Sequence, residues 1–332
     1  MLGGLIRKVF QTGAVPSADE AQAIDRVVAA TDARLALLPG FRKALLPGVR
    51  ISRDYVASLV RDWPAPMALS LLSFTLDRRI GLFFSSPASL RAALARSESL
   101  LAFFHTPSLG DEAVALLVMQ RTDTQRYGLE SHNGELRGDV PQVVVSFDHQ
   151  RVVLPAASWD ALRAQAVLRG QDMIAHVIAR RLSLLTQERS ELESELTRIR
   201  LRLASLAHPE ALLIDAMPAD DPLPHDQAGL LARQAAAQTR LTELRGVTEL
   251  SGLLELVAHM LTHPQDYFRL EKETLCLDRM GVLRTGQGED AGTEICMETL
   301  HLSAGEPMRQ VVLPVRIDRR AMDELMRSTM AE

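Results

Sequence analysis

Apolar residues in the middle of the chain recur with the spacing of a coiled coil. Between Gln171 and Ala207 there is neither proline nor glycine, so the pattern predicts one uninterrupted helix. Its stripe alternates in steps of four and three residues and has one polar member: Ile178, Leu182, Leu185, Arg189, Leu192, Leu196, Ile199, Leu203 and Leu206. This spacing, about 3.5 residues on average, is typical of helices that wrap around a partner helix, so something must cover the stripe.

The segment that follows carries a second, looser apolar stripe. After a proline-rich linker at 208–224, a helix is predicted from about Asp226 to Thr262, just before His263 and Pro264. The two helices can bury each other as an antiparallel coiled-coil hairpin. Pairing within one chain costs less entropy than binding a separate partner. For contacts with another protein, the predicted interaction surface is Leu182, Arg189, Leu192, Leu196 and Ile199.

Strand-like patterns lie on both sides of this hairpin. From Glu112 to Pro155, β-branched and apolar runs predict an antiparallel meander of about four strands, with turns at 132–134 and at Asp148-His149. From Tyr267 to Asp318, similar runs predict a second meander, followed by a helix that Asp318 caps. We therefore expect two antiparallel β-meander units, one before and one after the hairpin.

The two β segments share a short sequence. Val152-Val153-Leu154-Pro155 recurs as Val311-Val312-Leu313-Pro314, and each copy is followed by a capping residue and a predicted helix. Duplication of one unit and two unrelated meanders both remain open. If the units are related, an antiparallel hairpin would bring them side by side, where their edges could pair and hide strands that would otherwise be exposed.

The N-terminal region reads as a bundle of helices. Ser17, with Glu20 three residues later, predicts a capped helix start. The fold class we predict is α+β and helix-rich. Its four consecutive segments are an N-terminal helical domain at 1–108, a β-meander unit at 109–157, the helical hairpin at 158–264, and a second β-meander unit with a C-terminal helix at 265–332.

Composition narrows the range of partners and compartments. The formal charge is −5 and the pI is near 6.0, whereas nucleic-acid-binding domains usually carry a clustered excess of basic residues. A nucleic-acid partner is therefore not expected. Two cysteines cannot form a secreted-type disulfide framework, which favours the cytoplasm. No apolar run approaches the roughly 18 to 20 residues that span a bilayer.

The first ten residues form a short amphipathic segment. Leu5, Ile6 and Phe10 are apolar, and Arg7 and Lys8 are basic, a combination that can lie on an anionic membrane surface. Packing of this segment against the protein's own helices is the competing interpretation.

Candidate metal ligands occur at one place in the sequence. His259 and His263 stand four residues apart on the predicted helix, which would put both imidazoles on one face. The three residues between them include no glutamate base, and no third ligand is evident.

The sequence patterns that could indicate a catalytic site are weaker than the histidine pair that could indicate a metal site. Ser146, Asp148 and His149 suggest a hydrolase, but adjacent residues on a strand point to opposite faces. Cys276 and Cys296 lie in apolar alternation, which favours packing roles. The chain contains no nucleotide-binding loop, so we predict no catalytic residue and no cofactor.

The function we predict from the sequence is therefore a non-enzymatic cytoplasmic scaffold or adaptor, acting through protein–protein contacts or self-association of the hairpin. One alternative is an enzyme or small-ligand sensor with a dispersed site between the β units. Another is a peripheral membrane factor that residues 1–10 recruit.

Overall fold

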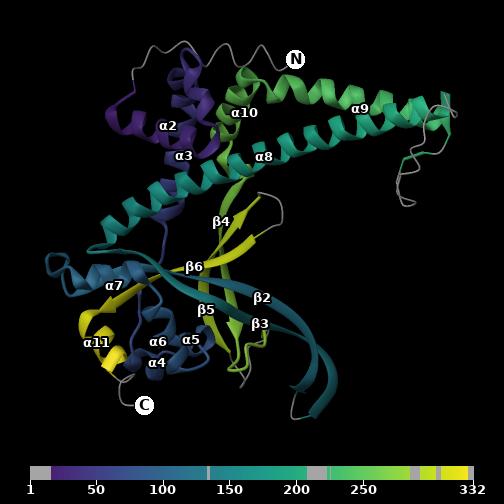
Figure 1. The fold of residues 1–332 in the computed structure, drawn as a ribbon. Helices are drawn as coiled ribbons and strands as arrows, with labels where there is room; N and C mark the ends of the chain where they lie inside the picture. Colours follow the sequence, from purple (N-terminus) through teal and green to yellow (C-terminus); the bar gives the residue numbers. More distant parts are fainter. Residues whose placement is uncertain are drawn as a thin grey trace. The chain divides into compact units, whose positions relative to one another are not determined.

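The computed structural model describes residues 16–132, 135–207, 223–224, 226–284, 292–303 and 308–327. It divides into two compact units, each built from two stretches of the chain (Figure 1). The first unit comprises Met1–Ser52 and Asp172–His263, and the second comprises Arg53–Gln171 and Pro264–Glu332. This division differs from the four consecutive segments expected from the sequence. The class is α+β and rich in helix, as predicted.

The first unit is entirely helical among its described residues. Its elements are α2 (Ala18–Thr31), η1 (Ala33–Leu37), the start of α3 (Phe41–Arg61), most of α8 (Trp159–Ala207), α9 (Gln227–Thr248) and α10 (Leu250–Thr262). Helix α2 begins at Ser17, whose side chain accepts a hydrogen bond from the backbone N–H of Glu20 while Glu20 accepts one from Ser17. The predicted capping box is thus confirmed.

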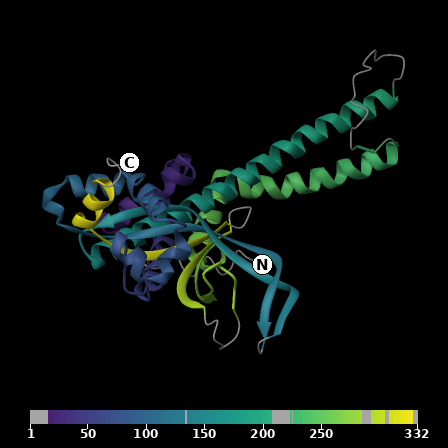
Figure 2. The ribbon, with the colours of Figure 1, turned by 90° about the horizontal axis from the view of Figure 1, so that it is seen from below.

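Helices α8 and α9 lie side by side in antiparallel order (Figure 2). Leu196 of α8 packs with Ala237 and Leu241 of α9, and three residues later Ile199 packs with Leu230. Because positions rise along α8 as they fall along α9, the chain reverses between the two helices. The 49 residues of α8 are unbroken, as the absence of proline and glycine between 171 and 207 predicts.

The second predicted helix is interrupted in the structure. Helix α9 ends at Thr248, Glu249 takes an extended conformation with ψ near 152°, and α10 begins at Leu250. A β-carbon on Gly252 would lie 2.0 Å from the carbonyl oxygen of Gly246, so the chain can fold back this tightly only with glycine at 252.

The second unit contains the sheet and the helices packed on it. Its strands are β1 (Met67–Ala68), β2 (Glu112–His132), β3 (Glu135–Ala156), β4 (Phe268–Leu277), β5 (Thr293–Leu302) and β6 (Met308–Asp318). They form one sheet in the order β3-β2-β6-β5-β4, with antiparallel pairing throughout that path and β1 parallel to β6. The two β segments are therefore parts of one sheet, joined by nine residue pairs from Glu112↔Asp318 to Gln120↔Gln310.

The first β segment has two long strands where four short ones were predicted. The turn expected at Asp148-His149 is a bulge: the β2–β3 register shifts between Val118 and Gln120, and His149 there has φ 55°. Asp139 and Leu154, which also have positive φ, lie at the other two register shifts of this pair. Bulges absorb the irregular residues, so the strands bend and continue.

The two copies of the repeated sequence flank the same residues of β2. Val153 and Val152 of β3 pair with Leu116 and Leu117 from one side, and Pro314 and Leu313 of β6 pair with them from the other. Their local geometry differs, because Leu154 lies at a bulge whereas β6 pairs with β2 without a shift. Duplication of the units stays a prediction.

The sheet curls until its outer strands approach each other. Residues 281–284 connect them: the Val145 N–H donates to Gly281 O and the Leu283 N–H donates to Val143 O, while the Arg284 N–H donates to Cys276 O. Isolated bridges of Val282 with Val144 and of Leu283 with Leu277 complete the closure. Residues far apart in sequence thereby share one curled surface.

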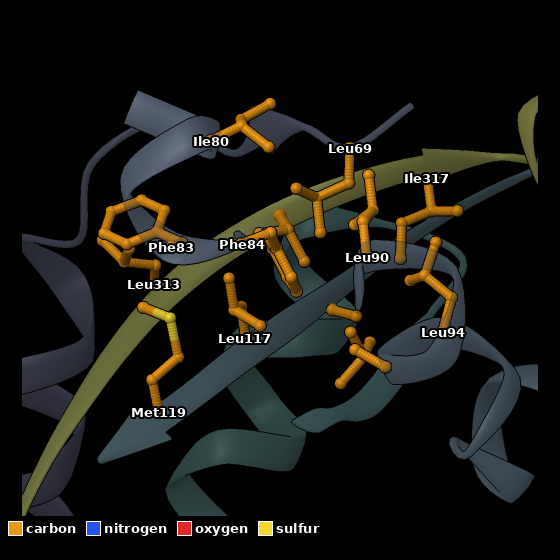
Figure 3. Packing of buried hydrophobic residues seen from close by; sticks show 14 of the residues in the cluster. Leu69, Ile80, Phe83, Phe84, Leu90, Leu94, Leu117, Met119, Leu313 and Ile317 are labelled. Carbon is orange, nitrogen blue, oxygen red and sulfur yellow. The ribbon is translucent and has the colours of Figure 1, made fainter. Parts of the chain in front are cut away.

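One face of the sheet, which we call the core face, is covered by short helices. These are α4 (Leu71–Leu76), α5 (Arg78–Phe83), α6 (Pro87–Ala95), α7 (Glu98–His105) and α11 (Arg319–Arg327), with η2 (Pro107–Leu109) and η3 (Pro264–Asp266) as connections. Phe83 and Phe84 pack with Leu117, Met119 and Leu313 of the strands (Figure 3). The same core reaches Leu277 of β4 and Met297 of β5, so the core face continues across the whole sheet.

Candidate functional site

The predicted interaction surface on α8 is mostly occupied within the chain. Leu182, Leu196 and Ile199 are buried, and Leu192 packs against the cluster of Leu196 with α9. Arg189 is the exception, with 40% of its side chain exposed. The apolar stripe is therefore covered along Leu182, Leu192, Leu196 and Ile199, whereas Leu206 at its end is 48% exposed.

Arg189 has partners on both helices of the pair. Its Nε donates to Glu193 Oε1 at 2.9 Å, one turn along α8, and its Nη1 donates to Thr248 Oγ1 at 3.3 Å at the end of α9. The polar position in the stripe thus lies beside the break between α9 and α10. Two further contacts join α8 to α9: Arg233 donates to Glu195, and Arg240 Nε donates to Glu188 Oε1 at 2.7 Å.

Exposed leucines gather where α8 ends and α9 begins. Leu201 and Leu206 near the end of α8 are 62% and 48% exposed, and Leu231 at the start of α9 is 49% exposed. In this stretch Ile199 and Leu230 are fully buried against each other. Leu206 follows Ile199 by seven residues on the same apolar stripe, whereas Leu201 and Leu231 lie off the buried faces of their helices. We call Leu201, Leu206 and Leu231 the tip leucines.

A polar cluster occupies the core face of the sheet beyond the hydrophobic core. Side chains alternate along a strand, so Glu271 and Glu273 lie on the same face of β4 as Leu275 and Leu277, which belong to the core. On β2, Arg121 follows Met119 on that face. The cluster comprises Arg121 and Asp123 of β2, Glu271 and Glu273 of β4, and Thr299 and His301 of β5.

Arg121 ties the two β segments together at this cluster. Its Nε and Nη2 donate to Asp123 at 2.7 Å each, and its Nη1 donates to Glu273, 152 positions later in the sequence. Only 12% of the Arg121 side chain is exposed. Burial works against the charge of Arg121, but its hydrogen bonds with Asp123 and Glu273 outweigh burial and raise its pKa above the usual value.

The other half of the cluster holds polar atoms without partners. His301 Nε2 lies 3.4 Å from Glu271 Oε2 without forming a hydrogen bond to it, and Nε2 is buried without a hydrogen-bond partner among the described residues. Thr299, which pairs directly with Glu271, is 1% exposed, and its Oγ1 likewise has no partner among the residues described. Buried polar atoms are nearly always hydrogen-bonded, so a bound ligand or an ordered water is expected beside these two atoms.

This cluster could hold a metal ion. Glu271, Glu273 and His301 each offer one ligand atom, and these three atoms lie within 4.8 Å of one another. Among the described residues they form the one group of three or more such side chains with this spacing. The sequence signal was faint: Glu271 and Glu273 stand on the face that the following leucines bury, but nothing local indicates Arg121 or His301 as neighbours.

The histidine pair predicted as a metal clamp is arranged differently. The rings of His259 and His263 lie with their centroids 4.4 Å apart and their planes tilted by 39°, and His263 lies just beyond the end of α10. His263 Nδ1 lies 3.0 Å from the carbonyl oxygen of His259, within the same turn. No third His, Cys, Asp or Glu joins them in the part of the chain that the structure describes.

The remaining residues singled out by the sequence are dispersed. Ser146 Oγ lies 3.5 Å from Thr122 O, and His149 is part of the β3 bulge. Cys276 and Cys296 are half-buried free thiols on β4 and β5. The membrane-contact candidates Leu5, Ile6, Arg7, Lys8 and Phe10 lie outside the described residues. No helix in the described part is both long and apolar enough to cross a bilayer.

Comparison with known proteins gives no lead. The chain matches no family model, and neither a curated protein nor a solved structure shows significant similarity to it. Its function must therefore be inferred from the residues described above.

Proposed function

We propose that the chain is a non-enzymatic scaffold or adaptor that binds other protein surfaces through the paired helices α8 and α9. The observation that carries this proposal is the position of the tip leucines, at the end of the pair and largely exposed while their neighbours Ile199 and Leu230 are buried. Exposed apolar side chains of this kind favour a protein contact site.

The pair is suited to present such a contact because it is held rigidly. We infer that it is a coiled coil, since each of the two apolar clusters with α9 contains a residue of the four-and-three stripe of α8, Leu196 in one and Ile199 in the other. The pairs Glu195–Arg233 and Glu188–Arg240 fix the register rather than adding much stability, because their side chains are partly or largely exposed. A rigid pair presents its tip with little loss of conformational entropy on binding.

The occupant we test first is a second copy of the chain. We expect light scattering of the wild-type protein to give the mass of a dimer, and the double variant Leu201→Glu, Leu231→Glu to give the mass of a folded monomer. The matched control is Leu72→Glu, Leu76→Glu, because these leucines of α4 are 68% and 75% exposed and lie in the other unit. Circular dichroism should show the same helix content for all three proteins.

A different partner would give a monomeric wild type. In that case the wild type and the α4 variant should capture a protein that the tip variant does not. Equal masses and equal capture by all three proteins would contradict the proposal.

A second candidate function is the binding of a small ligand by an enzyme or sensor, at a site between the two β segments. It is favoured by Thr299 Oγ1 and His301 Nε2 of β5, which are buried without hydrogen-bond partners among the described residues. A ligand that binds only the folded protein raises its melting temperature. Stabilisation that disappears in Thr299→Val would support this candidate, and its absence for all ligand classes would contradict it.

Recruitment to a membrane surface by residues 1–10 stays a prediction. Membrane partitioning that is unchanged after deletion of this segment would dismiss it.

A further inference from the structure

We propose that Glu271, Glu273 and His301 bind a divalent transition-metal ion, with Zn²⁺ as the reference ion. This inference rests on the second candidate function above and names its ligand class. Two carboxylates and one imidazole are a donor set that Zn²⁺ accepts, usually with three protein ligands and water in the fourth position. The two strands that carry these residues, β4 and β5, pair without a register shift from Phe268↔Leu302 to Leu277↔Thr293.

The ligand atoms need only a small rearrangement to meet an ion. They lie within 4.8 Å of one another, and tetrahedral ligation at about 2.0 to 2.2 Å requires separations of roughly 3.3 Å. The Glu271 Oε2–His301 Nε2 distance, 3.4 Å, already has this value. The Glu271 side chain is 52% exposed and free to rotate, so closure does not require the sheet to move.

Thr299 supplies an independent observation at the same place. It stands between Met297 and His301 on β5 and directly opposite Glu271, so its side chain lies on the core face with the proposed ligands. Its Oγ1 is buried without a partner among the described residues. A metal-bound water at the fourth position would provide the hydrogen bond that Oγ1 otherwise lacks.

Arg121 positions one of the ligands. A carboxylate has two oxygens, so Glu273 can accept from Arg121 through one and offer the other to the ion. Outer hydrogen bonds of this kind orient metal ligands and are costly to remove. Asp123 in turn holds Arg121 through two hydrogen bonds, which completes a chain from β2 to the ion.

Nearby charge limits the affinity. Arg269 and Arg309 are the strand neighbours of His301 on either side, and both are exposed. Together with Arg121 they balance Asp123, Glu271 and Glu273, so the site has little net negative charge to attract a hard cation such as Mg²⁺. Zn²⁺, which bonds strongly to imidazole, suits such a site better.

Metal binding to the full chain tests this proposal directly. The protein is treated with a chelator, desalted, and titrated with Zn²⁺ by calorimetry and with Co²⁺ by visible absorption. We expect one equivalent to bind. We also expect Glu271→Gln and His301→Gln each to weaken binding by more than the roughly 10- to 100-fold that loss of an outer-sphere partner costs.

Two controls separate this site from others. Glu294→Gln changes an exposed glutamate of β5 whose side chain lies on the opposite face, and it should bind the ion like the wild type. The double variant His259→Gln, His263→Gln removes the adjacent histidines of the first unit and should also leave binding unchanged. Binding that His301→Gln leaves intact, or that the double variant abolishes, would overturn the proposal.

A failure of the metal proposal is distinguishable from a failure of the ligand site itself. If neither ion binds but inorganic phosphate raises the melting temperature of the wild type and not of Thr299→Val, the ligand site stands and the metal assignment is wrong. If ions and phosphate both leave the wild type unchanged, the metal assignment is overturned and the ligand site loses its main support.

Discussion

Gly252 lies so close to Gly246 that a β-carbon on Gly252 would meet the Gly246 carbonyl oxygen at 2.0 Å. This contact marks the place where α9 ends and α10 begins. The obstacle is backbone, so no side chain can rotate away to make room. The break in the helix, which the apolar pattern did not predict, thus has a local sequence determinant that only its surroundings reveal.

Gly252→Ala should lower the free energy of unfolding by about 1 to 3 kcal/mol, as overpacking does. The matched control is Gly246→Ala: nothing lies within 4 Å of its β-carbon position, and alanine favours helix by about 0.5 to 1 kcal/mol. Urea unfolding would measure both. Equal effects of the two substitutions would show that the close contact does not constrain the chain.

Glu20 should make the stability of the first unit depend on acid. The Arg50 guanidinium, which donates to both carboxylate oxygens, and the Ser17 backbone N–H lower its pKa to about 2. A lowered pKa contributes stability above the unfolded value, about 4.5, and this contribution is lost as the pH falls from there toward 2.

Glu20→Gln should therefore lower the melting temperature at pH 7 more than at pH 3. Asp19→Asn, which changes an exposed carboxylate in the same first turn, is the control. Thermal unfolding followed by circular dichroism at both pH values decides the matter. A wild type and a Glu20→Gln variant whose melting temperatures differ equally at pH 7 and pH 3 would rule out this linkage.

Burial along α8 predicts which leucines hold the helix pair together. Leu196 is 4% exposed and packs on Ala237 and Leu241, so Leu196→Ala should cost about 2 to 5 kcal/mol. Leu201→Ala, five residues later on the same helix and 62% exposed, should change stability by about 0.5 kcal/mol or less. Denaturant unfolding that ranks the two variants in the reverse order would refute the pairing of α8 with α9.

The sequence anticipated those features that local patterns determine. The unbroken α8 follows from a stripe without proline or glycine, and the start of α2 follows from the reciprocal bonds of Ser17 and Glu20. Both depend on residues a few positions apart, where periodicity and capping are directly visible in the sequence.

Contacts between residues far apart in the sequence could not be predicted, because periodicity and capping carry information only about residues a few positions apart. The contact of Arg121 with Glu273 joins residues 152 positions apart, and it exists only because β6 pairs with both β2 and β5 in one sheet. The polar pair Asp148-His149 predicts a turn, but in the structure His149 has a positive φ within a bulge, because polar residues and positive φ values occur in turns and bulges alike. Only the partner strand distinguishes the two, and no local pattern identifies that partner.

Arg189 gives a last test of the helix pair, because it is the polar member of an otherwise apolar stripe. Its bond to Glu193 is an exposed pair one turn apart, which contributes about 0.3 to 0.5 kcal/mol. Thr248 Oγ1, its other partner, also donates to the carbonyl oxygen of Leu244, so it keeps a hydrogen bond when Arg189 is replaced. The apolar surface that a leucine would bury at this position outweighs both losses.

Arg189→Leu should therefore raise the free energy of unfolding by about 0.5 to 1 kcal/mol, measured in urea. Arg200→Leu, on an exposed position of the same helix, should give no such gain because its side chain has nothing to cover. A loss of stability in Arg189→Leu would mean that the bonds to Glu193 and Thr248 hold the end of α9 against α8. The polar position would then fix the register of the pair at the break beside Glu249, as buried polar residues do in coiled coils.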